Sequence, residues 1–396
     1  MEIFISGAGI AGLSLACLLA QSGMSVAITD PNLPDTCPDN TEHGTRTAAI
    51  MNSILPVYEQ IDILDDIKSY STPLESLRIV DTPAKHFKKP IERVFHAREI
   101  NEAAFSWNVP NNYLLYTLLK KARTLDTLTL IPRDKVIGFT HHPAHITVET
   151  EKNGKYQCAL LVGADGRRSF VREHAGIKVN ETEFNQTAIT AILTHSKPHE
   201  NISTEIHKPG GPFTMVPLKT EGNNHYKSSL VWIETTPDAQ RISHLSKSEI
   251  TANIQSLSHG YLGNIELENM IQQTSISTMK SKKITGDRIA LIAEAAHTLP
   301  PTGAQGLNLS LRDITSLKEI LIEGKNLGSD LGSKTTLDRY ENARKHDIAL
   351  RSKSTDILNQ FIKQDSHFHH AVRRGAFSVL SDIQPLRETI MKKGFK

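Results

Sequence analysis

Short apolar runs that end in glycine-rich turns recur along the chain, each followed by residues at helical spacing. The first run, EIFIS at 2–6, precedes GAGIAG, and apolar residues then recur at helical spacing at Ile10, Leu13, Cys17 and Ala20. A second run, SVAITD, ends at Asp30. Short apolar runs suit buried parallel strands, and apolar residues three or four apart suit a helix. The N-terminus therefore predicts a strand, a tight turn, a helix and a second strand.

Two later runs end in loops in the same way. ALLVGADGRRS at 159–169 reaches a turn at Asp165 and Gly166. GDRIALI at 286–292 leads into AEAAHTLPPTGAQG, after which helical spacing resumes at Leu307, Leu311, Ile314, Leu317 and Leu321. The adjacent prolines restrict the backbone and remove two amide donors. This pattern predicts an irregular loop that brings the N-terminus of a helix to a fixed point.

The spacing of the first glycines predicts a dinucleotide site. Gly7 permits the tight turn, Gly9 lets a pyrophosphate approach the backbone, and Gly12 lets the helix pack on the strand. The helix N-terminus offers amide donors and a partial positive charge to phosphate. Asp30 lies where an acid that binds a ribose hydroxyl is expected. These residues alone leave open whether the dinucleotide is NAD or FAD.

Composition narrows the classes of protein. A chain of 396 residues suggests two domains or one large domain with insertions. A net charge of +2 without a Lys/Arg block argues against a nucleic-acid partner. Cys17, Cys37 and Cys158 have neither disulfide nor zinc spacing, which favours a reducing cytoplasm. HHPAH at 141–145 and HFHH at 367–370 show no evident carboxylate or cysteine partner, so we predict no metal site.

Taken together, three motifs carry a family resemblance. In order, GAGIAG, GADGRRS and GDRIALIAEAAHTLPPTGAQGLNLSLRD resemble the single-component FAD-dependent aromatic hydroxylases with the para-hydroxybenzoate hydroxylase fold. TRTAAI around Arg46 resembles the arginine segment of that family. GPFTMVPL and SSLVWIET resemble middle-domain segments of its ubiquinone-biosynthesis branch.

The resemblance implies an α/β fold, with a Rossmann-like FAD-binding domain, an inserted β-sheet substrate domain and a C-terminal helical segment. The FAD-binding domain would be discontinuous, built from residues 1–72, 102–182 and 283–350. The substrate domain would take residues 73–101 and 183–282, where Pro217 suits a strand end or edge. Residues 351–396 would be helical and pack outside.

The resemblance also implies which residues hold FAD. The expected contacts are Gly7, Ala8, Gly9, Ile10, Ala11, Gly12, Asp30, Arg46, Asn111, Val136, Asp165, Gly166, Glu294, Pro301, Gly303, Ala304, Gln305, Gly306, Leu307 and Asn308. The last seven would border the isoalloxazine, where a helix N-terminus favours the anionic reduced flavin. Within this loop, His297 and Pro301 are the candidates for a direct part in catalysis.

Two positions depart from the family pattern. Asn111 stands where related enzymes often have a longer Arg or Gln. Ala293 and Glu294 stand where the family usually has Gly-Asp, so the backbone gains a Cβ and the carboxylate is one methylene longer. Both changes would alter how the cofactor is held.

The implied reaction is hydroxylation of an electron-rich ring. NAD(P)H reduces FAD, and the reduced flavin reacts with dioxygen to give a C4a-hydroperoxide that the ring attacks. The resemblance points to a polyprenylated phenol in ubiquinone biosynthesis. The alternatives are a hydroxylase of a small soluble aromatic acid and a flavin-binding assembly subunit of a biosynthetic complex. A long apolar tunnel would favour the prenylated substrate, and a closed pocket with an arginine would favour the acid.

The membrane is a further expected partner. No apolar run reaches the roughly 18 residues that a span needs, so a cytoplasmic enzyme would meet a prenylated substrate at the inner-membrane surface or receive it from a partner. Residues 371–396 are the candidate contact. Their apolar residues are Val379, Leu380, Ile383, Leu386 and Ile390, and their basic residues are Arg373, Arg374, Arg387, Lys392, Lys393 and Lys396. An amphipathic terminal helix that packs on its own protein is the alternative.

Overall fold

The structure is a computed structural model. It describes residues 1–34, 44–82, 90–220, 225–301, 303–363, 387–389 and 391–392, with residues 357–363 described by their backbone alone. Cys37, the HFHH segment and most of 371–396 lie outside these ranges.

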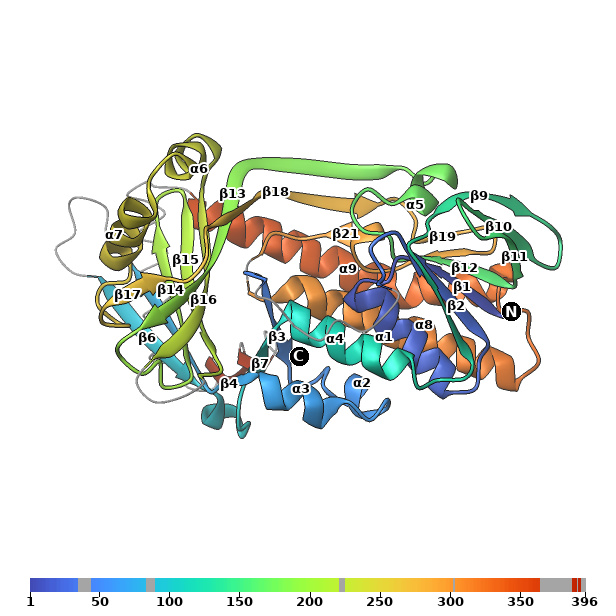
Figure 1. Cartoon of the computed structure of the whole chain (residues 1–396), viewed down its shortest axis with the longest axis horizontal. Coiled ribbons are helices and arrows are strands. Elements are labelled where there is room, and N and C mark those ends of the chain that lie inside the picture. Colours follow the sequence, from blue (N-terminus) through green and yellow to red (C-terminus); the bar gives the residue numbers. More distant parts are fainter. Residues whose placement is uncertain are drawn as a thin grey trace.

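Among the described residues, six strands form the sheet of the first unit. Its order is β19 (Thr285–Gly286), β20 (Ile289–Leu291), β12 (Leu160–Gly163), β1 (Ile3–Ser6), β2 (Val26–Asp30) and β8 (Leu128–Pro132). Pairing is parallel from β20 to β8. The helices α1 (Ile10–Gln21), α4 (Asn111–Ala122) and α8 (Gln305–Asn326) pack beside it around one apolar core (Figure 1). This is the strand–turn–helix–strand arrangement that the N-terminal pattern predicts.

A second sheet of nine strands forms the other unit within the described ranges. Its order is β21 (His297–Thr298), β18 (Gln272–Ser281), β13 (Val179–His195), β16 (Tyr226–Thr235), β15 (Gly211–Leu218), β14 (Ile202–Lys208), β5 (Ser76–Asp81) and β6 (Ile91–His96), with β17 (Ile265–Leu267) on β13. The helices α6 (Thr236–Ser243) and α7 (Lys247–Leu257) cover one face. Pro217 is the last residue but one of β15 and lies beyond the register that β15 shares with β14, as expected for a strand end.

Smaller elements complete the two units. β3 (Thr47–Met51), β7 (Ser106–Pro110) and β4 (Thr72–Leu74) form one small sheet, and β9 (Val136–His141), β10 (Ile146–Thr150) and β11 (Gly154–Cys158) form another. The short helices are α2 (Pro56–Glu59), η1 (Ala97–Ile100), α3 (Leu64–Tyr70), α5 (Phe170–His174) and η2 (Ala293–Ala295). The long α9 (Lys334–Lys363) packs on α8 and reaches β14 and β15 of the nine-stranded sheet (Figure 1).

Three of the expected domain boundaries fall inside elements. The boundary at 72/73 cuts β4, the boundary at 182/183 cuts β13, and the boundary at 350/351 cuts α9. One long strand and one long helix carry the chain between the two sheets, so no loop marks these boundaries. The division into a cofactor unit and a substrate unit stays a prediction.

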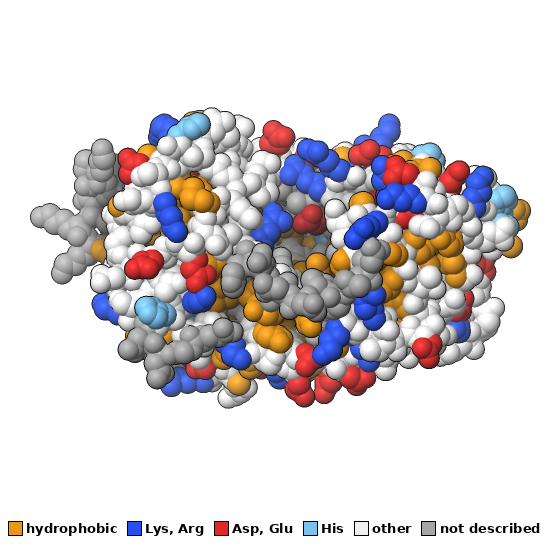
Figure 2. All heavy atoms as spheres, viewed as in Figure 1, with side chains coloured by type: hydrophobic (Ala, Val, Ile, Leu, Met, Phe, Trp, Pro, Cys, Tyr) orange, Lys and Arg blue, Asp and Glu red, His pale blue; other side chains and the backbone are white. Residues whose placement is uncertain are grey.

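Figure 2 shows acidic, basic and hydrophobic side chains interspersed over one face of the molecule. Among the described residues, no helix is both long enough and apolar enough to cross a membrane.

Candidate functional site

The glycine turn after β1 is held by close backbone packing. Gly7 has a φ of +105°, and a Cβ on it would lie 2.4 Å from the carbonyl oxygen of Ala164. A Cβ on Gly12 would lie 1.9 Å from the carbonyl oxygen of Gly7. At Gly9, in contrast, a Cβ would meet no atom within 4 Å. Gly7 and Gly12 are therefore required by packing, whereas Gly9 leaves open space into which a phosphate fits.

Asp30, at the end of β2, connects the second strand to that turn. Its carboxylate accepts hydrogen bonds from the backbone N–H groups of Ala8 (3.0 Å) and Asn32 (2.7 Å). Ala8 thus donates to Asp30 rather than outward. The acid that the sequence assigns to a ribose also fixes the turn itself.

Asp165 plays a comparable part at the end of β12. Its carboxylate accepts from the Ser169 hydroxyl and from the backbone N–H of Val171 (3.1 Å), and the Ser169 hydroxyl in turn accepts from the N–H of Arg172. Burial raises the pKa of the Asp165 carboxyl. Asp165 therefore anchors the first turn of α5.

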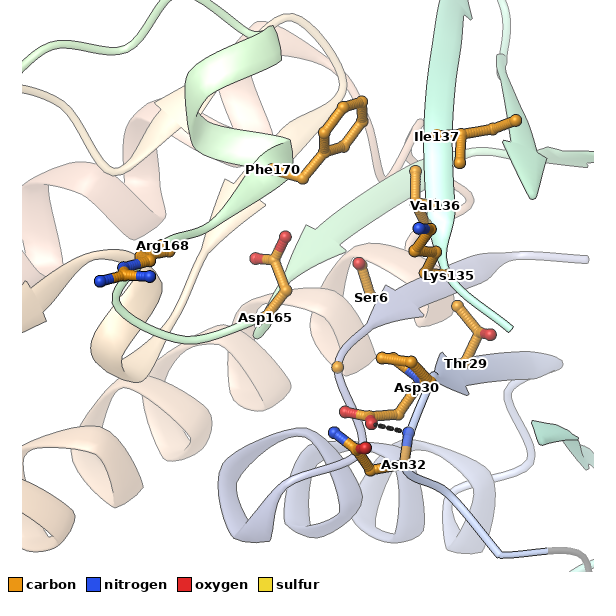
Figure 3. Close-up of a pocket in the computed structure, with 12 residues that line it drawn as sticks. Ser6, Thr29, Asp30, Asn32, Lys135, Val136, Ile137, Asp165, Arg168 and Phe170 are labelled. Atoms are coloured by element: carbon orange, nitrogen blue, oxygen red, sulfur yellow. Dashed lines mark hydrogen bonds between the residues drawn. The ribbon is translucent and has the colours of Figure 1, made fainter. Parts of the chain in front are cut away.

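These residues meet at one cavity of about 530 Å³ at the carboxyl ends of β1, β2 and β12. Of the residues expected from the sequence, Gly7, Asp30, Val136 and Asp165 line it. The sequence reasoning missed the other lining residues, which are Ser6, Thr29, Pro31, Asn32, Lys135, Ile137, Arg168 and Phe170. Phe170 stands across the cavity from Val136 and Ile137 (Figure 3). Its place directly after GADGRRS was the signal that could have identified it.

The second group of expected residues surrounds the start of α8. Gly303 and Ala304 have φ values of +63° and +54°, and α8 begins at Gln305. Pro301, Gly303, Ala304 and Gly306 are exposed, and a Cβ on Gly306 would meet no atom within 4 Å. The loop thus presents an open backbone surface to a ligand. None of these residues lines the cavity at Asp30.

Asn308 fixes this helix start to β3. Its Oδ1 accepts from the N–H of Met51 (2.9 Å), and its Nδ2 donates to the carbonyl oxygens of Ala49 and Ala304, both at 2.7 Å. The Asn308 side chain is therefore engaged inside the protein, which leaves its backbone for a cofactor contact.

The departure at Ala293 has a visible backbone consequence. Ala293 has a φ of +56°, a left-handed conformation that glycine adopts without a Cβ clash. Its N–H donates to Asp313 Oδ2 at 3.1 Å. The neighbouring Glu294 is exposed. The carboxylate that would hold the ribityl chain therefore follows directly on a strained residue.

His297 is engaged with a carboxylate of the following helix, α8. Its side chain is buried, and its Nε2 lies 2.6 Å from Asp313 Oδ2, while Arg344 Nε donates to Asp313 Oδ1 at 2.8 Å. Burial acts to raise the pKa of Asp313, but His297 and Arg344 outweigh it and lower that pKa. His297 belongs to a buried polar network that supports the loop, and its direct part in catalysis stays a prediction. The sequence reasoning missed Asp313, whose signal was a carboxylate beside the apolar positions of α8.

Arg46 and Asn111, separate in sequence, come together beside β3. The N–H of Asn111 donates to the carbonyl oxygen of Arg46 at 3.0 Å, and Arg46 itself donates to Thr274 Oγ1 at 3.2 Å. The side-chain oxygen of Asn111 is buried and has no partner among the described residues. The side-chain oxygen of Asn111 is therefore available to accept a hydrogen bond from a donor group of a cofactor bound beside β3.

The other expectations concern a metal site and the C-terminal segment. Within the described ranges, no three His, Cys, Asp or Glu side chains are grouped as metal ligands. Arg387 pairs with Glu99 at 2.7 Å and lies over the Phe95 ring, so it contacts its own protein rather than presenting a free charge. Met391 packs on Ala97 and Phe105.

Comparison with known proteins identifies the family. The family model described as FAD binding domain matches residues 1–351. The chain is 28% identical to ubiquinone hydroxylase UbiL of Rhodospirillum rubrum, over 99% of this chain and 88% of UbiL. It is 26% identical to ubiquinone hydroxylase UbiM of Neisseria meningitidis, over 99% and 84%. The structure of p-nitrophenol 4-monooxygenase PnpA from Pseudomonas putida shares the fold, with a TM-score of 0.79 at 17% identity, over 100% of this chain and 99% of PnpA. Because the family model matches most of this chain, the protein belongs to the FAD-binding domain family, and it is a FAD-dependent monooxygenase.

Proposed function

We propose that the protein hydroxylates the ring of a polyprenylated phenol in ubiquinone biosynthesis, with dioxygen and NAD(P)H as co-substrates. The similarity to two ubiquinone hydroxylases along nearly the whole chain supports this proposal. The alternative substrate, a small aromatic acid, would need a cationic side chain to pair with its carboxylate. The charged side chains on the face of the nine-stranded sheet toward the cofactor unit help to distinguish a phenol from an acid as the substrate.

The residues at both ends of the site fit FAD. The cavity at Asp30 offers apolar walls at Val136, Ile137 and Phe170, which suit an adenine ring, and open space at Gly9 for the pyrophosphate. The start of α8 would border the isoalloxazine, with Asn111 and Glu294 as side-chain contacts. FAD, when bound, supplies electron transfer from NAD(P)H and delivery of one oxygen atom of dioxygen to the ring. The protein must orient the ring and exclude water.

Hydrogen bonds identify which face of the nine-stranded sheet lies toward the cofactor unit. Thr45 Oγ1 lies 2.9 Å from Thr190 Oγ1, and Thr47 Oγ1 lies 2.9 Å from Ser229 Oγ. Thr47 opens β3, the strand that Asn308 holds to the start of α8. Side chains that share a row with Thr190 and Ser229 therefore point toward the expected flavin.

The strand register gives the composition of that face. Thr190 pairs with Val231, Val231 with Thr214, and Thr214 with Glu205; in the adjacent row, Ile192 pairs with Ser229 and Ser229 with Val216. Directly paired residues lie on the same side of a sheet. Thr190, Thr214, Val216 and Val231 are half-buried, although they lie on central strands of the sheet, so this face borders open space.

Glu205 lies inside this row, which continues through Ile79 of β5 to Arg93 of β6. Glu205 Oε1 lies 2.7 Å from His207 Nε2, and their side chains are 19% and 7% exposed. In the two rows named, the described residues from β13 to β14 include no lysine or arginine. Beside Glu205, a substrate carboxylate would meet a carboxylate, whereas a phenol could donate its hydroxyl hydrogen bond to Glu205. This observation carries the proposal of a phenol rather than an acid.

The test is an oxygenation assay with two substrates. The purified protein, loaded with FAD, is given NADPH or NADH and either a polyprenylated phenol in detergent micelles or 4-hydroxybenzoate. We expect a product heavier by one oxygen atom, by mass spectrometry, from the prenylated phenol alone. Turnover of 4-hydroxybenzoate alone would refute the proposed substrate class. Protein that binds no FAD would refute the enzyme and assembly-subunit proposals together, whereas FAD-loaded protein that turns over neither substrate would favour the assembly subunit.

Peripheral contact with the membrane remains part of this proposal, since a prenyl tail resides in the bilayer. Sedimentation with anionic liposomes at low and high salt, for the full chain and for a chain ending at Ser381, measures it. We expect salt-sensitive binding that the shorter chain loses. Equal binding by the shorter chain would remove 382–396 from the proposal.

A further inference from the structure

A continuous chain of polar contacts links the two ends of the loop between β20 and α8. At the first end, Ala293 and His297 both contact Asp313 Oδ2, at 3.1 and 2.6 Å. At the other end, Gln305 Oε1 accepts from Arg351 at 2.8 Å. The loop in between presents the exposed backbone of Gly303 and Ala304.

The link between those ends runs along α9. Asp313 Oδ1 accepts from Arg344, Arg344 donates to Asp347 at 2.9 Å, and Arg351 donates to Asp347 at 2.8 Å. Arg344, Asp347 and Arg351 are three and four residues apart, so they share one face of the helix. α9 runs antiparallel to α8 here, because Arg351 meets residue 305, Arg344 meets residue 313 and Arg339 meets residue 323.

The same group carries an excess of positive charge. It joins Arg344 and Arg351 with Asp313 and Asp347, and Arg312 of α8 lies within electrostatic range of both arginines. Nε and one terminal nitrogen of Arg312 are buried without a partner among the described residues. Burial, and then Arg351, lower the pKa of the Arg312 guanidinium. Three cations and two anions therefore lie behind the N-terminal half of α8.

We propose that Arg351 is a positioning residue for the flavin. Through Gln305 it holds the start of α8 where FAD binding requires it, and its charge favours the anionic reduced flavin over the oxidised one. Both effects act on the ring through the helix start and through space, without contact between Arg351 and the reacting atoms. The site residues named above include neither Arg351 nor its partners on α9.

The part of α9 around Arg351 also contacts the nine-stranded sheet. Asp356, five residues after Arg351 on α9, accepts a hydrogen bond from Thr278 of β18. The rise of a helix places these two positions about 7–8 Å apart along its axis. A single stretch of α9 thus contacts both the helix start of the flavin loop and the sheet of the substrate unit.

The test compares two arginines of the same helix. Arg351→Gln removes the contact with Gln305, and Arg339→Gln is the matched control, because Arg339 pairs with Glu323 near the far end of α8. The dissociation constant of FAD is measured by titrating the apoprotein, and the flavin midpoint potential by equilibration with a reference dye. No aromatic substrate is present, so the result does not depend on the proposed reaction.

We expect Arg351→Gln to weaken FAD binding roughly tenfold, about 1.4 kcal/mol, and to lower the midpoint potential, with Arg339→Gln unchanged in both. Arg351→Lys keeps the charge but not the fork of donors, so it should restore the potential more fully than the affinity. If Arg351→Gln does not fold, Arg351→Lys serves in its place, and it should weaken FAD binding while leaving the potential near the wild-type value. Identical values for Arg351→Gln and Arg339→Gln, or unchanged FAD affinity in Arg351→Lys, would overturn the proposal.

Discussion

The glycine turn at residues 7–12, the expected nucleotide end, and the loop between β20 and α8, the expected flavin loop, are both irregular backbone segments at the start of a helix. They are held in different ways. Gly7 and Gly12 are fixed by backbone atoms within 2.4 Å of where their Cβ atoms would be. In the flavin loop, two non-glycine residues, Ala293 and Ala304, adopt left-handed φ values. Side chains elsewhere hold that backbone, among them Asp313 and Asn308. Small residues within the turn itself determine the backbone conformation of the nucleotide end, whereas polar side chains outside the flavin loop hold the backbone of that loop.

The largest test of this difference removes Asp313. Asp313→Ala removes one of the two carboxylates that Arg344 contacts, leaving Asp347, and frees both Ala293 and His297. Breaking one partner of a buried pair costs about 3–5 kcal/mol. We expect a loss of stability of that size, measured by urea unfolding. A loss below about 1 kcal/mol would show that the loop does not depend on this network.

The contribution of Asp313 to the free energy of unfolding also depends on pH. Because its pKa is lowered in the folded protein, the stability it contributes is fully present above the unfolded value near 3.8 and is lost as pH falls through the folded value. Unfolding free energies at pH 6 and at successively lower values below 4 should therefore fall more steeply for the wild type than for Asp313→Asn. Parallel curves would contradict the assignment.

A second test addresses the nucleotide end. Gly12→Ala places a Cβ 1.9 Å from the Gly7 carbonyl oxygen, whereas Gly9→Ala meets no atom within 4 Å. We expect Gly12→Ala to lose about 3 kcal/mol of stability, the upper range for overpacking, and Gly9→Ala to lose far less but to bind FAD more weakly. Melting temperature and FAD content distinguish the two. Equal melting temperatures would mean that the turn relaxes more easily than its geometry suggests.

Glu294 tests the cofactor contact expected within the flavin loop. If its carboxylate holds the ribityl chain, Glu294→Ala should weaken FAD binding by about 1.5–3 kcal/mol, the value of a charge-assisted hydrogen bond. Glu294→Asp restores the usual family side chain and should bind FAD at least nearly as well. Wild-type FAD affinity in the alanine variant would remove Glu294 from the site.

The smallest expected effect is a gain. Ala293→Gly removes the Cβ from a residue with a φ of +56°. The relief of left-handed strain, about 1–2 kcal/mol, exceeds the added entropy of an unfolded glycine, about 0.5–1 kcal/mol. A rise in stability of about 0.5–1 kcal/mol is expected, as it is for Ala304→Gly. Thermal unfolding of both variants measures it, and a loss in either would show that the methyl group makes useful contacts.

The sequence by itself determined the elements whose causes are local. Strand β2 ends at Asp30, α1 begins at Ile10 within GAGIAG, and α8 follows its predicted apolar spacing, because period and small residues act on neighbouring backbone. It could not place Phe170 opposite Val136, since these residues belong to different segments that only the fold brings to one cavity. It also could not reveal the partner of His297, because a loop position does not show a buried carboxylate on the next helix.

Tertiary structure decided what the polar residues do. Asp313, Arg344 and Arg351 look in the sequence like ordinary charges on helices, and only the antiparallel packing of α8 on α9 makes them one network. Glu205 lies on the same face of its sheet as Thr190 because strand register sets the direction of every side chain in a row. Backbone geometry follows from nearby residues, whereas the partner of a charge depends on residues far away in the chain.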